Sequence, residues 1–364
     1  MPGLKIAHFG LPRQYSELRE EILDVTDRVL ATGCVMDGHY TKQFESWLAQ
    51  RNGRDYAVAC HSGTQALEII ARFYRERHAV IQKPRVVIPA LTYPATANAW
   101  ITAGWDIIFA DVDRWGVIDK VPEISEWDAI CMVGLYGHSI SERFFRGSWH
   151  EGWNQRLIIE DAAQHWLSNC CRRVGVASAI SFDPTKNFGS YGNGGAIVTS
   201  DPDVAKFARD WTRNGRASNH GNVGSNSRMS EVDCAQLMVK TYHLDRWQQR
   251  RADIARYYIT QFQSLPIHCL IQRDNFADHC YQKFVIEVEN RDQLKSRLAF
   301  DGIDTRIHYE RSLHELDAFS AYRCLPSLTK AIALSRRVLT LPLYPELTDS
   351  EVEFIADRVR AHVL

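Results

Sequence analysis

Between residues 56 and 199 the chain alternates short apolar runs with longer stretches of helical or loop character. These runs lie at residues 56–60, 86–90, 105–112, 128–137, 156–160, 178–182 and 194–200. Apolar residues at successive positions are typical of strands that helices cover on both faces of a sheet. Strands that alternate with helices predict an α/β fold with a mainly parallel sheet. Ligands of such sheets bind beyond the carboxyl ends of the strands, so candidate site residues should directly follow these runs.

After about residue 240 the pattern changes to that of one long amphipathic helix. Its apolar positions fall near helical spacing, at Leu244, Trp247, Ile254, Tyr258 and Phe262. This helix is followed by the segment KFVIEV, a helix from about Arg291, the segment TRIHY and a final helix from Ser350. We therefore expect a large domain over residues 1–240, including an N-terminal segment, and a smaller C-terminal α/β domain over residues 241–364.

The composition is that of an ordinary globular protein and narrows the class of function. The 364 residues are 45% hydrophobic and 24% charged, with a net charge of −1 and no basic tract, so we expect neither a nucleic acid nor a membrane as partner. The N-terminal residues lack the apolar core of a signal peptide, and no apolar run approaches the length of a membrane span. Nine cysteines without C-x-x-C spacing favour reduced thiols in a cytoplasm over disulfides or a zinc site, and no metal is expected.

Two segments near the first two runs contain candidate binding residues. HSGTQAL follows the first run, and the backbone N–H groups of Gly63 and Thr64 would lie at a helix N-terminus that favours an anion such as phosphate. The same turn would also serve as a plain helix cap. Tyr93 lies just beyond the second run, where its ring could lie flat on a planar cofactor or simply pack in a turn.

Two later segments add groups that can take part in catalysis. In EDAAQ, Asp161 directly follows the run at residues 156–160 and could be either a catalytic carboxylate or a helix cap, and Gln164 comes one helical turn later. In SFDPTKNFGSYGNGG, Ser181 closes a run and Lys186 lies in a glycine-rich loop. A lysine that forms a Schiff base needs a fixed loop and partial desolvation, which lowers its pKa, whereas an ordinary loop lysine is solvated.

The order of these segments resembles one known family, the DegT/DnrJ/EryC1/StrS sugar aminotransferases. Six segments look like motifs of this family: SGTQAL, TYPATANA, EDAAQ, SFDPTKNFG followed by GGAIVTSD, the G-x-N-x-R of GSNSR, and DTRIHYERSLHELDAF. They occur in the order that the family has, and the resemblance extends from about residue 12 to 360. The resemblance implies a fold-type I pyridoxal-phosphate-dependent transferase. It also implies a cycle through pyridoxamine phosphate, in which an amino acid, expected to be L-glutamate, donates its amino group to a keto sugar.

The resemblance also implies roles for residues that would bind the cofactor. Lys186 would form the covalent Schiff-base link and act as general base and acid, while Asp161 would pair with the pyridine nitrogen. The remaining contacts would come from Tyr93 stacked on the ring, Gln164 at its phenolic oxygen, and Gly63, Thr64 and Ser181 at its phosphate.

Other family positions imply an assembly and a substrate site. Asn226 would reach the phosphate of the neighbouring subunit's cofactor, so we expect a homodimer with shared active sites. Arg228, which lies in the same polar loop and could reach an anion, is assigned to substrate binding together with His308, Tyr309 and His314.

Some departures from the family pattern leave the sugar undecided. Asn193 stands at a position where the family often has an acidic residue. Residues 138–155 are more aromatic than is usual in the family. The segment SNCCRR, which contains Cys170 and Cys171, replaces a turn that is rich in glycine and alanine in the family. A nucleotide-linked hexose, in amino-sugar, lipopolysaccharide or secondary-metabolite biosynthesis, is favoured. A free keto sugar, a sugar-acid aldehyde and a cyclitol ketone stay open.

Three other functions compete with the aminotransferase. A sugar dehydratase on this scaffold would have histidine in place of Lys186, and a non-catalytic regulatory protein would not need Asp161, Gln164, Ser181 and Lys186 together. A nicotinamide dehydrogenase has only GSYGNGG in its favour, which does not give G-x-G-x-x-G after a strand, and we reject it.

Overall fold

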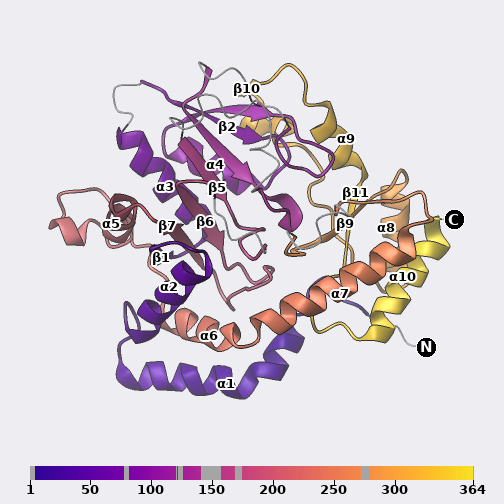
Figure 1. The fold of residues 1–364 in the computed structure, drawn as a ribbon, viewed down its shortest axis with the longest axis horizontal. Coiled ribbons are helices and arrows are strands. Elements are labelled where there is room, and N and C mark those ends of the chain that lie inside the picture. Colours follow the sequence, from indigo (N-terminus) through magenta and orange to yellow (C-terminus); the bar gives the residue numbers. More distant parts are fainter. Residues whose placement is uncertain are drawn as a thin grey trace.

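A computed structural model describes residues 5–77, 82–119, 121, 126–140, 157–168, 174–271 and 279–363 (Figure 1). Its α-helices are α1 (Leu11–Thr32), α2 (His39–Arg51), α3 (Gly63–Arg77), α4 (Pro94–Thr102), α5 (Pro202–Trp211), α6 (Glu231–Thr241), α7 (Leu244–Phe262), α8 (Arg291–Phe300), α9 (Thr329–Arg337) and α10 (Asp349–Val363). Its short 3-10 helices include η2 (Leu135–Gly137) and η7 (Leu313–Glu315). Within the described ranges, no helix combines the length and the apolar character that crossing a bilayer requires.

The strands form two sheets. They are β1 (Tyr56–Cys60), β2 (Arg85–Pro89), β3 (Asp106–Ala110), β4 (Ala129–Val133), β5 (Leu157–Asp161), β6 (Ala177–Ser181), β7 (Gly195–Thr199), β8 (His268–Cys269), β9 (Phe284–Glu287), β10 (Arg323–Cys324) and β11 (Val338–Leu341). The large sheet has the order β1-β7-β6-β5-β4-β2-β3-β10. β7 is antiparallel to β1 and β6, and the other neighbours in this sheet are parallel. The expected α/β fold with a mainly parallel sheet is therefore confirmed, and each expected run overlaps one strand.

The run at residues 128–137 is longer than the strand that it predicts. β4 ends at Val133, and the chain then turns through η2, where Tyr136 has a positive φ of 63°. Leu135 and Tyr136 are fully buried although they lie outside the strand. The apolar run therefore continues because the turn packs in the core, not because the strand does.

Helices cover the large sheet on both faces, as the apolar runs indicate. Because successive side chains of a strand point to opposite faces, Val58 and Cys60 of β1 belong to the core beneath α3, α4 and α5. Ala57 and Ala59 pack instead with Phe44 of α2 and with α6. Both faces are thus buried, which a mainly parallel sheet requires.

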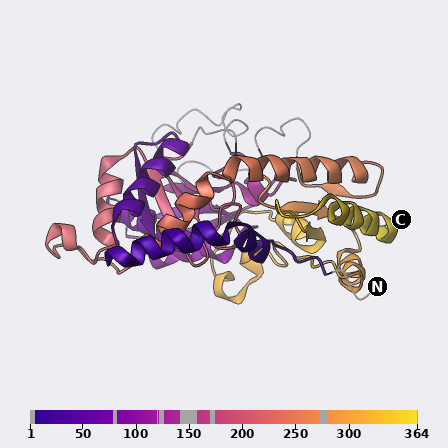
Figure 2. The same cartoon turned by 90° about the horizontal axis from the view of Figure 1, so that it is seen from below.

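The C-terminal part has a second hydrophobic core. The three-stranded sheet β11-β9-β8 is antiparallel. Tyr258 and Phe262 of α7 pack there against Phe284 of β9 and Val359 of α10. Figures 1 and 2 show α7 extending from beside the large sheet to α10. The N-terminal segment joins this part too, because Ile6 is buried in the same core and pairs with residue 303.

Candidate active site

A cavity of about 440 Å³ lies at the carboxyl ends of the central strands, where the sheet rule places a ligand. Its walls come from the ends of β1, β2, β4, β5 and β6 and from the C-terminal part of the chain. Its lining includes Gly63, Thr64, Tyr93, Asp161, Gln164, Ser181, Lys186, Asn193, Lys283, His308 and Tyr309. Nine of the twelve candidate site residues predicted from the sequence therefore line this one cavity.

The first wall is the N-terminus of α3. Ser62 caps this helix, because its hydroxyl accepts the N–H of Gln65 at 3.2 Å. Gly63 lets β6 approach closely, since a Cβ on Gly63 would lie 2.7 Å from the Cβ of Ser181. Backbone N–H groups of the first helical turn and the Ser181 hydroxyl therefore line one end of the cavity. This arrangement suits a phosphate group.

Asp161 ends β5 in the middle of the sheet and is held from two sides. The hydroxyl of Thr96 in α4 donates to its Oδ2 at 2.7 Å, and the N–H of Ala163 donates to its Oδ1 at 3.2 Å. The apolar pattern does not mark Thr96, although this residue follows Tyr93 by three positions within TYPATANA. A carboxylate fixed in this way can face the protonated nitrogen of a flat ring.

Lys186 lies in the loop between β6 and β7 and is half-buried. Burial lowers the pKa of its amine, whereas the carboxylates of Asp183 and Asp161 favour the charged form. Its Nζ forms no hydrogen bond or ion pair with the residues that the structure describes. The lysine thus presents an amine to the same cavity that Asp161 and Ser181 line.

Gln282 holds the loop on both sides of Lys186. Its Oε1 accepts the N–H of Asn187 at 3.0 Å, and its Nε2 donates to the carbonyl of Thr185 at 3.1 Å. Asn187 in turn donates to the carbonyl of Cys280 at 2.6 Å. No motif in the sequence marks Gln282, because its role depends on a loop almost one hundred residues away.

Replacing Gln282 with methionine should loosen this loop. We expect two lost hydrogen bonds to destabilise the fold by about 1–3 kcal/mol and turnover to fall about tenfold, since a displaced Lys186 misaligns the proton transfer. Thermal unfolding and kcat of Gln282→Met would be measured beside the exposed-site control Gln263→Met. Unchanged kcat in both variants would show that the loop keeps its position without Gln282.

Gln164, Tyr136, His308 and Tyr309 link the two parts of the chain across the cavity. Gln164 donates from Nε2 to the Tyr309 hydroxyl at 3.1 Å and accepts the N–H of Tyr136 at 2.8 Å. The Tyr136 hydroxyl donates to the carbonyl of His308. Tyr93 lies at the mouth, with its ring centroid 5.8 Å from that of Tyr309. Burial raises the pKa of Tyr309 well above its usual value, so its hydroxyl stays protonated.

The remaining three candidates lie outside the cavity of this protomer. Asn226 is exposed, and Arg228 donates to Asp37 at 2.9 Å. His314 in η7 packs beside Phe109, with ring centroids 6.3 Å apart. The roles of these residues at a shared site or with substrate stay predictions.

The departures from the family pattern fall partly outside the described residues. Asn193 lies at the cavity, whereas residues 141–156 and 169–173, with Cys170 and Cys171, lie outside the described ranges. The seven cysteines in the described ranges are free thiols. The described residues contain no group of three or more histidine, cysteine or acidic side chains that could hold a metal ion.

The donors around the cavity fit pyridoxal phosphate. This cofactor needs three groups from the protein: a helix N-terminus with a serine hydroxyl at its phosphate, a fixed carboxylate at its ring nitrogen, and a desolvated lysine amine at its aldehyde. All three line one cavity, although they come from three different strand ends.

Comparison with known proteins gives the same result. The model of the DegT/DnrJ/EryC1/StrS aminotransferase family matches residues 16–360. The dTDP-3-amino-3,4,6-trideoxy-alpha-D-glucose transaminase of Streptomyces venezuelae is 31% identical, covering 98% of this chain and 96% of its own. The crystal structure of S. venezuelae DesV in complex with a ketimine intermediate has a TM-score of 0.88 at 30% identity, covering 98% of each chain. That of Bacillus subtilis NtdA with the bound cofactor PMP has a TM-score of 0.86 at 26% identity, covering 99% of this chain and 85% of its own. The chain therefore belongs to the DegT/DnrJ/EryC1/StrS aminotransferase family and is a pyridoxal-phosphate-dependent aminotransferase of fold type I.

Proposed function

We propose that this enzyme transfers the amino group of L-glutamate to the carbonyl carbon of a keto sugar, and that the sugar is nucleotide-linked. The observation that carries the proposal is the Lys186 amine, which lies without a protein partner among the described residues in the same cavity as Asp161 and the α3 N-terminus. The similarity to a dTDP-sugar transaminase over almost the whole chain supports a nucleotide-linked acceptor.

Each wall of the cavity has a separate task in binding the cofactor. The N–H groups of Gly63 and Thr64 and the hydroxyl of Ser181 bind its phosphate. Asp161, oriented by Thr96, holds a proton at the ring nitrogen. When bound, pyridoxal phosphate supplies a reactive carbonyl and a protonated ring that takes up electrons from the substrate carbon.

Lys186 then moves the proton that the reaction requires. Its amine would act as the general base that removes the proton from the amino-bearing carbon of the donor, and the resulting ammonium would act as the general acid. In the second half of the cycle it moves a proton in the reverse direction, onto the sugar carbon. Burial lowers the pKa of this amine and so favours the neutral form that the first step needs.

A half-reaction assay tests the proposed function. Adding L-glutamate to the holoenzyme should bleach the visible absorbance of the cofactor, and adding the correct keto sugar should restore it and yield an amino sugar detectable by mass spectrometry. Nucleotide-linked keto hexoses and the corresponding free keto sugars would be compared. Turnover of the free sugars alone would overturn the nucleotide assignment, and the absence of an amino product from every keto sugar would overturn the sugar assignment.

We further propose that the active enzyme is a homodimer in which Asn226 of each chain reaches the cofactor phosphate of the other. Asn226 is exposed in the protomer and lies outside its own cavity, while the nearby Arg228 is held by Asp37. In a twofold dimer one loop meets its copy reciprocally, so a single loop can complete both sites.

Mixing two inactive variants should restore activity if the sites are shared. Asn226→Asp places a carboxylate against the phosphate, and Lys186→Ala removes the reacting amine. After subunit exchange half of the dimers are mixed, and each contains one site with both native residues, so about a quarter of wild-type activity should return. The same mixture made with Lys206→Ala in place of Asn226→Asp should give about half of wild-type activity with or without exchange, and it controls for inhibition by the Lys186→Ala chain. A dead mixture despite confirmed exchange, or an active monomer, would refute the shared site.

A further inference from the structure

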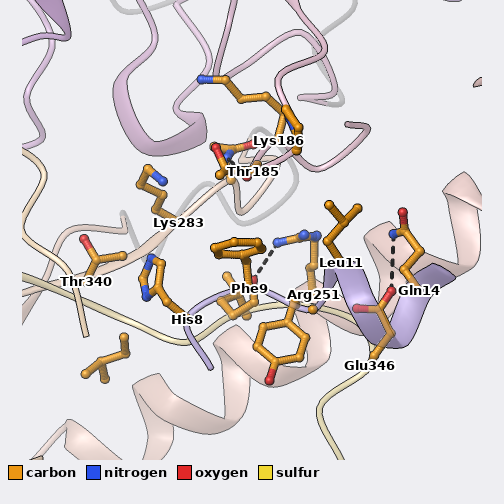
Figure 3. A pocket seen from close by; sticks show the side chains of 16 residues that line it. His8, Phe9, Leu11, Gln14, Thr185, Lys186, Arg251, Lys283, Thr340 and Glu346 are labelled. Atoms are coloured by element: carbon orange, nitrogen blue, oxygen red, sulfur yellow. Dashed lines mark hydrogen bonds between the residues drawn. The ribbon is translucent and has the colours of Figure 1, made fainter. Parts of the chain in front are cut away.

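Lys283, just before β9, is a second buried lysine at the active-site cavity. Its side chain is 9% exposed, and its backbone N–H donates to the carbonyl of Tyr136 at 3.1 Å, which fixes its position. It lines both the main cavity and a smaller adjoining one, where Figure 3 shows it between His8 and Thr185–Lys186. Its Nζ forms no hydrogen bond or ion pair with any residue in the described ranges.

The charges that face Lys283 are mostly positive. Burial, together with the cations Lys186 and Arg251, lowers the pKa of its amine to about 7, and Asp183 opposes this shift. The histidines that face it, His8 and His308, are neutral, since burial lowers their pKa values to about 3 and about 2. A buried ammonium group without a carboxylate partner is unfavourable. The surroundings of Lys283 therefore suit an anion that arrives with a ligand.

The reaction itself supplies such an anion. Lys186 and Lys283 are the two lysines among the described residues that line the main cavity, and arginine is not among those residues. Lys186 takes part in the proton transfer, and the phosphate of the cofactor would bind at the N-terminus of α3 and Ser181, to which the proposed function assigns it. An amino-acid donor has a carboxylate directly on the carbon that reacts at Lys186, so this carboxylate must lie close to that lysine.

We propose that Lys283 binds the α-carboxylate of the amino donor and thereby sets the enzyme's affinity for amino acids. The inference rests on the proposed function, because it assumes that an amino acid and a keto sugar use this cavity in turn. A keto sugar has no charge beside its carbonyl. Because the amine of Lys283 can lose its proton near neutral pH, the residue is not left as an unpaired buried cation when the sugar replaces the donor.

The first test removes the amine while keeping the length of the side chain. Lys283→Met holoenzyme should bind L-glutamate about 10- to 100-fold more weakly, the loss expected for a hydrogen bond to a charged group. Affinity is measured from the bleaching of the cofactor absorbance at increasing glutamate concentration. L-isoglutamine, whose α-carboxylate is replaced by an amide, should bind with the same affinity to the wild type and to Lys283→Met. L-glutamine, which keeps the α-carboxylate, should bind more weakly to Lys283→Met, as L-glutamate does.

The second test uses pH and keeps the charge. The affinity of the amine-form enzyme for 2-oxoglutarate, whose carboxylates do not titrate near neutral pH, should fall as pH rises through about 7, where Lys283 loses its charge. Lys283→Arg should bind 2-oxoglutarate without this fall, because a guanidinium stays charged over the whole range. This comparison also holds if Lys283→Met does not fold.

The outcomes separate this inference from the proposed function. Wild-type bleaching by glutamate with unchanged affinity in Lys283→Met would overturn the role of Lys283 and leave the aminotransferase in place. A variant that loses only its affinity for the acceptor would overturn the donor assignment, since the anion would then belong to the sugar. Wild-type holoenzyme that is not bleached by any amino acid would refute the proposed function itself.

Discussion

Replacing Lys186 with alanine is expected to lower turnover by at least about 10⁴-fold, because the substrate loses its general base and the cofactor its covalent link. The amine forms no hydrogen bond or ion pair with the described residues, so its removal should cost little stability. The loop itself is held through backbone groups of Thr185 and Asn187, which the substitution leaves in place. The variant should therefore fold normally and still bind the amine form of the cofactor.

Chemical labelling checks the identity of this lysine independently of turnover. Borohydride treatment of the wild-type holoenzyme should fix the cofactor to the peptide that contains Lys186. Lys206→Ala, a substitution at an exposed lysine of α5, should label as wild type does. A label that maps to Lys283 or to any other lysine would show that the reactive amine has been misassigned.

The fold could be predicted from the sequence wherever burial on both faces produces a continuous apolar run. β1 to β7 meet this condition, and each of them overlaps an expected run. β10 does not, because it is a two-residue edge strand whose residues Arg323 and Cys324 are exposed. Its pairing with β3 depends on the tertiary fold. The division of the chain at residue 240 stays a prediction.

The site could be predicted where a strand end is followed by a residue with an obvious chemical role, as at Asp161, Ser181 and Lys186. Residues that act through distant contacts could not be found in this way. Gln282 and Lys283 both lie in the segment before β9, which carries no motif of its own. Gln282 reaches the loop of Lys186, and Lys283 reaches the cavity, because this segment packs against that loop. Such residues require knowledge of the packing between the two parts of the chain.

Replacing Asp161 with asparagine should lower kcat by roughly 10- to 1000-fold with little change in stability. A carboxylate at ion-pair distance raises the pKa of a cationic ring nitrogen by about one to three units, and each unit corresponds to about 1.4 kcal/mol. Asparagine keeps the shape of the side chain: its oxygen can accept the N–H of Ala163, and its amide group can donate to the hydroxyl of Thr96, which can also act as an acceptor. It lacks the charge that holds a proton on the ring.

The same substitution separates the catalytic role of Asp161 from a structural one. Its Oδ1 accepts the N–H of Ala163 at 3.2 Å, a contact typical of a local turn or helix cap, and asparagine serves in such positions as well as aspartate. If the carboxylate were only a cap, Asp161→Asn would therefore turn over at nearly the wild-type rate. Thr96→Val provides the complementary control, since it leaves the charge in place but removes one of its two supports. We expect a smaller loss of kcat in Thr96→Val than in Asp161→Asn, and the reverse order would show that orientation matters more than charge at this position.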